Sequence, residues 1–235
     1  MKKLFLVMIM GVSMTSIGQN SDSLKFQSGN RNFELQISPF ADNPISMNEF
    51  KFRYFNSPNS AFRISGNISQ SSSSSITQQA IDSLDQLELK EKSSSFSLRL
   101  SPGYEHHFAG TNRFSPYIGG GIDLGFSRTS LKSDFQVLDE SFYVRYVNGQ
   151  AGGEGPTQKE YVSIGANAFA GFDYYITKGI YLGTELGLGL THYNYLGVKL
   201  KSDVDGFEEP EAIKQGGSTT INKRVNGSLR LGFLF

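Results

Sequence analysis

Alternation of apolar and polar residues with a period of two is the feature that most constrains this chain. The pattern recurs in eight segments after residue 30, and it is typical of strands whose side chains point to opposite faces in turn. The segments are Arg31–Phe40, Glu49–Asn56, Ala61–Ser69, Ser95–Phe108, Pro116–Ser127, Val162–Ile176, Ile180–Tyr193 and Val225–Phe235. The sequence therefore predicts an all-β protein with eight antiparallel strands.

The lengths of the connections distinguish a barrel from a soluble sandwich. The turns at Ser57–Ser60, Ala109–Ser115 and Thr177–Gly179 are short, whereas the connections after the third, fifth and seventh strands are long. Outer-membrane barrels have short periplasmic turns and long extracellular loops. A soluble sandwich has no reason to place its short connections at one end and its long connections at the other. We therefore expect an eight-stranded, antiparallel, up-and-down transmembrane β-barrel.

The first residues are typical of a targeting signal. Lys2 and Lys3 precede the apolar run 4–12, and Ser16 and Gly18 supply small residues at a cleavage site. We expect residues 1–18 to be a signal peptide that is removed, 19–30 to be a short periplasmic segment and 31–235 to form the barrel. No later apolar run has the length of a membrane-spanning helix, so insertion is expected through strands.

Composition argues against several classes of function. Lys and Arg together number 22, as do Asp and Glu, so we expect no nucleic-acid partner. Cysteine is absent and histidine occurs three times, so we expect no metal, no cofactor and no catalytic residue. His192 is interpreted as a rim residue. His106 and His107 should point to opposite faces and are interpreted as interfacial.

The inward parity of the strands collects ten charged residues, five of each sign. An eight-stranded barrel is narrow enough for inward side chains to fill it, and buried charges persist when they are paired. A salt-bridged plug is therefore favoured over a narrow selective conduit. Within it we expect Arg63 to meet Glu105 and Arg99 to meet Asp123. The predicted charge network comprises Glu34, Lys51, Arg53, Arg63, Arg99, Glu105, Asp123, Asp173, Glu185 and Arg230.

Aromatic residues gather at the expected periplasmic ends of the strands, where they would form an interfacial girdle. The expected members are Tyr54, Phe62, Tyr104, Phe108, Phe114, Tyr174, Tyr175, Tyr181, Phe233 and Phe235. Of the long connections, Gln70–Lys92 is predicted to be a mobile polar loop or a short helix. Ser133–Val147 keeps its alternation, which suggests that the fifth and sixth strands continue beyond the membrane. Asp203–Glu209 is interpreted as a solvated acidic turn.

Two segments carry a family resemblance. Phe114–Gly121 and Gly165–Thr177, the latter followed by Tyr181–Glu185, resemble the small eight-stranded outer-membrane barrels of the OmpA-transmembrane, OmpX and opacity-protein type. The last strand resembles the assembly signal that the outer-membrane insertion machinery reads, with Phe233 and Phe235 as its aromatic residues. The resemblance implies the barrel and its location in the outer membrane, and it implies no particular biochemical role.

The functional expectation is a non-enzymatic outer-membrane protein with a structural role or with extracellular loops that contact partners. A narrow channel or transporter for small solutes is the alternative, and a lipid A-modifying enzyme is less favoured. The expected partners are outer-membrane lipid, the insertion machinery during assembly, and a host or envelope protein that the loops would contact.

Overall fold

The computed structural model describes residues 24–37, 45–82, 85–137, 140–149, 151–152, 155–156 and 160–235. Within these ranges the chain forms strands and no helix, and so contains no helix long and apolar enough to cross a membrane. The strands are β1 (Arg31–Ile37), β2 (Ile45–Ser57), β3 (Ser60–Asp82), β4 (Asp85–His107), β5 (Phe114–Val137), β6 (Glu140–Val147), β7 (Ala151–Gly152), β8 (Gly155–Pro156), β9 (Tyr161–Thr177), β10 (Ile180–Tyr195), β11 (Lys199–Ser202) and β12 (Gly217–Leu234).

Eight of these strands close into a ring. β1 to β5 pair in chain order, β5 pairs with β9, β9 with β10, and β10 with β12. β12 then pairs with β1, from Asn32 opposite Leu234 to Ile37 opposite Leu229, and this pairing closes the barrel. Every pairing is antiparallel. The eight-stranded barrel expected from the alternation is thus confirmed.

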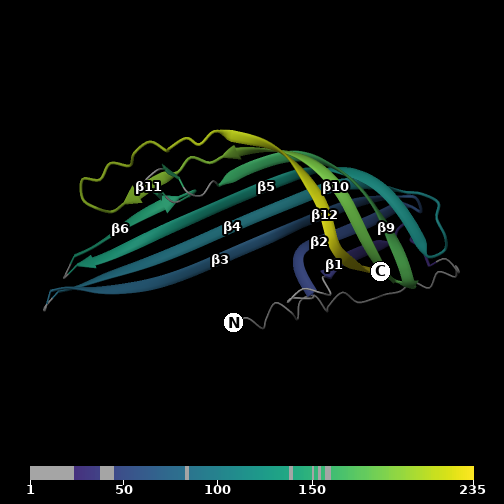
Figure 1. Ribbon diagram of the computed structural model, residues 1–235, viewed down its shortest axis with the longest axis horizontal. Coiled ribbons are helices and arrows are strands. Elements are labelled where there is room, and N and C mark those ends of the chain that lie inside the picture. The colour runs from purple at the N-terminus through teal and green to yellow at the C-terminus, as the bar shows by residue number, and fades with distance from the viewer. Residues whose placement is uncertain are drawn as a thin grey trace.

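The two ends of the barrel differ. At the end that we call the turn end, Pro58 and Asn59 join β2 to β3, and Lys178 and Gly179 join β9 to β10. Gly179 has φ +85°, a conformation that favours glycine in tight turns. The carboxyl terminus lies here too, where the amide of Arg31 donates to the carbonyl of Phe235 at 3.0 Å. The long connections emerge at the opposite, loop end (Figure 1).

Three barrel strands continue far beyond the loop end (Figure 1). β3 and β4 remain paired to the tip of their hairpin, with Ser72 opposite Ser94 and Gln79 opposite Leu87. The prediction of a polar loop or a helix over Gln70–Lys92 was therefore wrong for its described part. The serine run has no hydrophobic period to reveal a strand. Its backbone is nevertheless paired, because β4 supplies a ladder on one side and itself pairs with β5 on the other.

Of the fifth and sixth barrel strands, which were both predicted to continue over Ser133–Val147, only the fifth does so. β5 extends to Val137, but residues 140–147 form the separate strand β6, which turns back along β5. The sixth barrel strand, β9, begins only at Tyr161. β5 leaves β9 after Phe126 and pairs with β6 from Ser130, and β6 in turn pairs with β11. We call the sheet beyond Phe126, made of the far parts of β3 to β5 with β6 and β11, the lobe.

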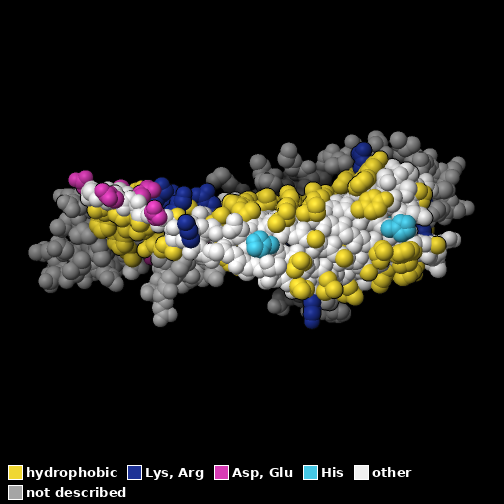
Figure 2. Space-filling view, turned by 90° about the horizontal axis from the view of Figure 1, so that it is seen from above, with side chains coloured by type: hydrophobic (Ala, Val, Ile, Leu, Met, Phe, Trp, Pro, Cys, Tyr) yellow, Lys and Arg dark blue, Asp and Glu magenta, His cyan; other side chains and the backbone are white. Residues whose placement is uncertain are grey.

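The distribution of side chains in the barrel is inverted relative to a soluble protein. Large apolar residues are exposed on the outer face, including Ile64, Ile122, Ile164, Leu186 and Leu188. Charged residues are buried inside (their contacts are described below). In Figure 2 apolar side chains spread over the barrel, and charged side chains gather toward the lobe. A soluble protein rarely exposes a contiguous apolar surface of this extent, which marks a surface made for membrane or protein contact.

Two aromatic residues expected in the outer girdle lie elsewhere. Tyr175 and Tyr181 are 1% and 0% exposed and point into the barrel. Tyr175 follows Tyr174 directly, and since neighbouring strand residues face opposite ways only one of the two can face outward. The girdle assignment was therefore wrong for these two. Six other expected members are exposed at the turn end, namely Tyr54, Phe62, Tyr104, Phe108, Tyr174 and Phe235, while Phe114 and Phe233 are half-buried.

Candidate functional site in the barrel interior

Arg53 on β2 is the centre of the buried charges. Its side chain is fully buried and touches three carboxylates from three other strands. Nη1 lies 2.9 Å from both Glu105 Oε2 and Asp173 Oδ2, and Nη2 donates to Glu34. The guanidinium carries five donors in a planar fork, so one Arg can serve several carboxylates at once. The alternation of β2 sends Arg53 inward, while its neighbour Tyr54 faces out.

Glu185 on β10 forms the second centre of the network. Lys51 Nζ lies 2.9 Å from Glu185 Oε2, and Arg63 Nη1 lies 2.8 Å from the same oxygen. Arg230 Nη1 lies 3.4 Å from that oxygen and 2.8 Å from Glu34 Oε2, which joins the two centres. The expected pair is also present, since Arg63 Nη1 lies 2.9 Å from Glu105 Oε1.

Eight of the ten predicted residues thus form one connected network. Its cations are Lys51, Arg53, Arg63 and Arg230, and its anions are Glu34, Glu105, Asp173 and Glu185. Four charges of each sign leave no net charge in this part of the lumen. Unpaired charges in such a dry interior would cost several kcal/mol each, and mutual pairing with hydrogen bonds offsets that penalty. Together these side chains form a plug across the barrel.

Tyrosines complete the plug. Tyr181 Oη donates to Glu34 Oε1 at 2.6 Å and accepts from Arg53 Nη2 at 2.6 Å. Tyr117 Oη donates to Glu185 Oε2 at 3.0 Å and accepts from Arg230. Both rings are fully buried. Their rings fill the space between the charged groups, and their hydroxyls make additional hydrogen bonds to the carboxylates and guanidinium groups of the network.

The amino-terminal segment seals the turn end. Phe26 is buried against the inward face of the barrel, where its ring stacks on Phe55 with centroids 3.8 Å apart. It meets Tyr175 and Tyr181 edge-on at 5.2 and 5.4 Å, and the Arg53 guanidinium lies 5.4 Å from its centroid. Phe26 was not predicted to be a residue of the lumen. Its only signal is a single aromatic residue in a polar stretch, followed by Gly29, whose amide bonds to the Phe55 carbonyl at 2.7 Å.

The lumen is less tightly filled toward the loop end. A cavity of about 270 Å³ lies there, lined among others by Arg99, Asp123, Tyr161, Thr191 and Lys223. Its polar walls are the part of the interior that could admit water or a small solute. Glu160, which directly precedes β9, is buried and accepts hydrogen bonds from Ser127 and Thr129.

Arg99 and Asp123 both line this cavity, but the register differs from the expected one. Arg99 lies opposite Gly125, and the neighbouring pair is Leu100 with Leu124. Asp123 is buried and accepts hydrogen bonds from Ser101, two residues from Arg99, and from Asn167 Nδ2 at 2.9 Å. The expected pairing puts the centre of the β4–β5 hairpin at residue 111, whereas the observed pairing puts it at residue 112. Moving the centre of a hairpin by one residue changes the partner of each residue by two positions.

The three histidines lie in different surroundings. His106 and His107 point to opposite faces, but His107 was wrongly assigned to the membrane interface. It is buried in the lumen, with Nδ1 3.0 Å from Ser115 Oγ and Nε2 3.3 Å from Glu105 Oε2. His192 is exposed on the outer face, and its Nδ1 lies 2.9 Å from Thr219 Oγ1. Within the described ranges, no three His, Asp or Glu side chains are grouped as metal ligands would be.

The terminal and loop residues singled out by the sequence lie at opposite ends. Phe233 on β12 is paired with Phe33 and Ile180, and the amide of Phe235 donates to the Arg31 carbonyl at 2.9 Å. In the loop after β11, the Tyr143 amide donates to Asp203 Oδ1 at 2.6 Å, and Lys201 Nζ lies 3.0 Å from Glu209 Oε1. The acidic turn expected over Asp203–Glu209 is mostly exposed.

Comparison with known families decides the assignment. Residues 36–214 match the OmpA-OmpF-like porin family. The chain belongs to this family. It is an outer-membrane β-barrel protein, in agreement with the resemblance to small OmpA-type barrels. Among solved structures, the crystal structure of Acinetobacter baumannii CarO2 aligns at 11% identity with a TM-score of 0.36, covering 89% of this chain and 100% of that one. A search of curated proteins found no match.

Proposed function

We propose that this protein is a closed, non-enzymatic barrel that crosses the outer membrane with eight strands and displays its lobe at the cell surface. In this arrangement the turn end faces the periplasm, residues 1–18 are removed as a signal peptide, and the exposed apolar face contacts lipid. Phe233 and Phe235 would be read by the insertion machinery during assembly. The lobe then provides the surface through which a host or envelope protein is contacted.

The observation that carries the closed state is the filled lumen. Eight paired charges cross the barrel, and the aromatic side chains of Phe26, Phe55, Tyr175 and Tyr181 pack below them. A passing ion would have to separate buried partners that sit within 3 Å of each other, such as Arg53 and Glu105. Leaving such charges unpaired in a dry interior costs several kcal/mol per group. This cost argues against conduction.

The shape of the lobe supports a role in surface contact. β3 and β4 are 23 residues each, about twice the roughly 9–11 residues that a tilted strand needs to cross the apolar core of a membrane. Residues 71–77 of β3 are all exposed. A paired hairpin of this length holds its side chains at fixed positions, which is the property that a recognition surface needs and a mobile loop lacks.

Recording from single molecules in planar bilayers tests the closed state. We expect the wild-type protein to give no steady conductance. The double variant Arg63→Ala/Glu185→Ala, which removes one cation and one anion from the plug, should give measurable current. His192→Ala, a change on the outer face, is the matched control and should behave as wild type. Steady conductance from the wild type would overturn the proposal and favour the alternative, a narrow conduit for small solutes that enter through the cavity at the loop end.

Excision of the outer hairpin tests the surface role. Joining Gln70 to Phe96, which are paired neighbours, by an Asn-Gly turn removes residues 71–95 without changing the register of the barrel. Cells that carry the shortened protein should retain heat-modifiable, outer-membrane material but lose adhesion to host or neighbouring cells. Unchanged adhesion in every such assay would contradict a contact role for the hairpin. A changed lipid A mass spectrum on overexpression would instead indicate a lipid-modifying enzyme.

A further inference from the structure

A row of cations crosses the lobe at a single register position. Lys92 on β4 lies directly opposite Lys132 on β5, Lys132 opposite Arg145 on β6, and Arg145 opposite Lys201 on β11. We call these four residues the cation row. Directly paired strand residues share a face and neighbouring strands lie about 5 Å apart, so the row places four positive charges side by side. Like charges directly opposite one another destabilise a sheet.

Local carboxylates compensate the row only in part. Lys132 Nζ lies 2.5 Å from Asp134 Oδ1, and Lys201 Nζ lies 3.0 Å from Glu209 Oε1, both pairs at the surface. Arg145 Nε donates to Ser130 Oγ at 2.9 Å. Lys92 has no ion pair within the described ranges, and the same holds there for the nearby Arg128 and Lys199. A cationic surface with this much uncompensated charge is suited to an anionic partner.

The row lies on the face of the sheet that continues the apolar outer face of the barrel. Leu98 pairs with Phe126, Phe96 with Arg128, Ser94 with Ser130 and Lys92 with Lys132, with no register shift between them. Side chains two residues apart on a strand share a face. The face that is apolar up to Phe126 therefore becomes cationic immediately beyond it, on the side where the membrane surface would lie.

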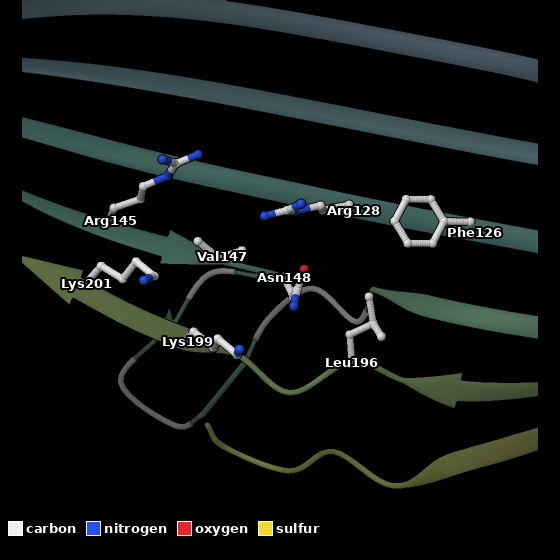
Figure 3. Close-up of a pocket in the computed structure, with 8 residues that line it drawn as sticks. All are labelled: Phe126, Arg128, Arg145, Val147, Asn148, Leu196, Lys199 and Lys201. Atoms are coloured by element: carbon white, nitrogen blue, oxygen red, sulfur yellow. The ribbon is translucent and has the colours of Figure 1, made fainter. Parts of the chain in front are cut away.

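A hollow of about 370 Å³ joins the two kinds of surface. Its lining includes Phe126, Arg128, Arg145, Leu196 and Lys201. Phe126 and Leu196 lie at one end of it, nearest the barrel, and Arg145 and Lys201 lie at the other (Figure 3). An apolar end next to the membrane and a cationic end away from it match a molecule with an acyl part and a phosphate-bearing head.

We propose that the cation row, with Arg128 and Lys199, binds the phosphorylated headgroup of an outer-leaflet glycolipid. The cation row lies six residues beyond Phe126, about 20 Å along the strand and about 14 Å in height at a tilt of about 45°. The headgroup region of a simple phospholipid spans only about 5–8 Å on each side of a bilayer. Arg128, two residues beyond Phe126, lies at the level of such a headgroup, and the cation row continues the site toward phosphates carried on sugars beyond it. Arg and Lys at fixed spacing bind phosphate oxygens by charge-assisted hydrogen bonds.

Binding of purified lipid A to the full chain in non-ionic detergent tests this assignment. Native mass spectrometry would count bound lipid during titration with bisphosphorylated lipid A, with the same lipid A after removal of both phosphates, and with phosphatidylglycerol. We expect the bisphosphorylated form to bind at least about tenfold more tightly than the other two, because each charged hydrogen bond contributes at least that factor. Lys132→Gln/Arg145→Gln should abolish this preference.

Matched controls make each outcome decisive. Lys178→Gln removes an exposed cation at the turn end and should bind as wild type, and heat-modifiable migration reports that every variant is folded. The proposal would be overturned if the dephosphorylated lipid A bound as tightly as the bisphosphorylated form. It would also be overturned if Lys178→Gln lost the preference for bisphosphorylated lipid A as fully as Lys132→Gln/Arg145→Gln does. If millimolar inorganic phosphate displaced bound lipid A as effectively as free lipid A does, the site would be a general anion site and the glycolipid assignment would be wrong. The inference depends on the location in the outer membrane but not on whether the lumen conducts, so either proposal can fail alone.

Discussion

The barrel interior and the lobe treat charge in opposite ways. Inside the barrel, each cation of the network meets at least one carboxylate within 3 Å, and the charged atoms are almost wholly buried. On the lobe, cations are set beside cations, and their few carboxylate partners are exposed. Water explains the difference: charges must be paired where solvent is excluded, whereas like charges are tolerated where solvent screens them. The charges of the interior thus balance one another, whereas the cations of the lobe are only partly balanced by its own carboxylates.

Removing the centre of the network should have the largest effect. Arg53→Leu leaves the carboxylates of Glu34, Glu105 and Asp173 buried beside an apolar side chain. Removing one partner of a buried pair costs about 3–5 kcal/mol, and urea unfolding of refolded protein in detergent should show a loss of that size. Arg99→Leu, which alters an exposed cation of the same lumen, should change the free energy of unfolding by less than about 0.5 kcal/mol.

A double variant separates pairing from packing in this prediction. Arg53→Leu/Asp173→Leu removes a cation together with one of its anions, so it should lose less stability than Arg53→Leu alone. If the double variant were as unstable as the sum of the two single variants, the charges would not be coupled. The conclusion that pairing stabilises the buried charges of the interior, in contrast to the solvent-screened charges of the lobe, would then be wrong.

The next effect concerns the outer face of the barrel. Leu186 is 57% exposed and adjoins Ala170 and Val225 on the neighbouring strands. Arg at this position would place a charge in hydrocarbon and should cost about 2–4 kcal/mol in lipid. Gly187→Ser, one residue on and facing the lumen, should cost much less. Labelling by a lipid-dissolved photoreactive probe should mark the even positions from 182 to 190. Equal labelling of odd positions would contradict the membrane-facing assignment.

The alternation predicts which residues face inward but not what they meet. Parity placed Arg53, Glu105 and Glu185 in the lumen, because a strand of period two leaves only two choices for each side chain. It could not give the register, which depends on turn geometry, and so Arg99 was set against Asp123 when Ser101 lies there. Phe26 belongs to no periodic segment, so no pattern could assign it to the interior.

The lobe was missed for a different reason. Residues 71–75 are all serine, and hydrophobic periodicity carries no information where every side chain is small and polar. The strand continues there because its neighbours supply hydrogen-bonding partners, as the pairing of Ser73 with Ser93 illustrates. The strand is held in this region by backbone hydrogen bonds to its neighbours and not by burial of side chains. Hydrophobic alternation, which predicted the barrel strands, therefore could not predict it.

A smaller effect is expected for the tyrosine that braces the network. Tyr181→Phe keeps the ring that packs on Phe26 but removes the hydroxyl between Glu34 and Arg53. Hydrogen bonds to charged groups contribute about 1.5–3 kcal/mol, and the loss in urea unfolding should fall in that range. Tyr174→Phe alters an exposed hydroxyl on the outer face and serves as the control. An equal and small loss for both would mean that Tyr181 contributes through packing alone.

The smallest effect should have the opposite sign, and it tests the lobe directly. Lys92→Glu would turn a pair of like charges with Lys132 into a pair of opposite charges at the same register position. Opposite charges across strands contribute about 0.2–1 kcal/mol relative to neutral pairs, so the lobe should become more stable by about that amount in detergent without phosphorylated lipid. Hydrogen exchange of the amides of β4 and β5 beyond Phe126 should slow accordingly. Lys178→Glu makes the same change of charge at the turn end, far from the row, and should leave exchange in the lobe nearly unchanged. Faster exchange in Lys92→Glu would mean that the cations of the row do not repel one another measurably. Slower exchange would mean that Lys92 and Lys132 destabilise the lobe, so that their like charges are not there to stabilise the fold.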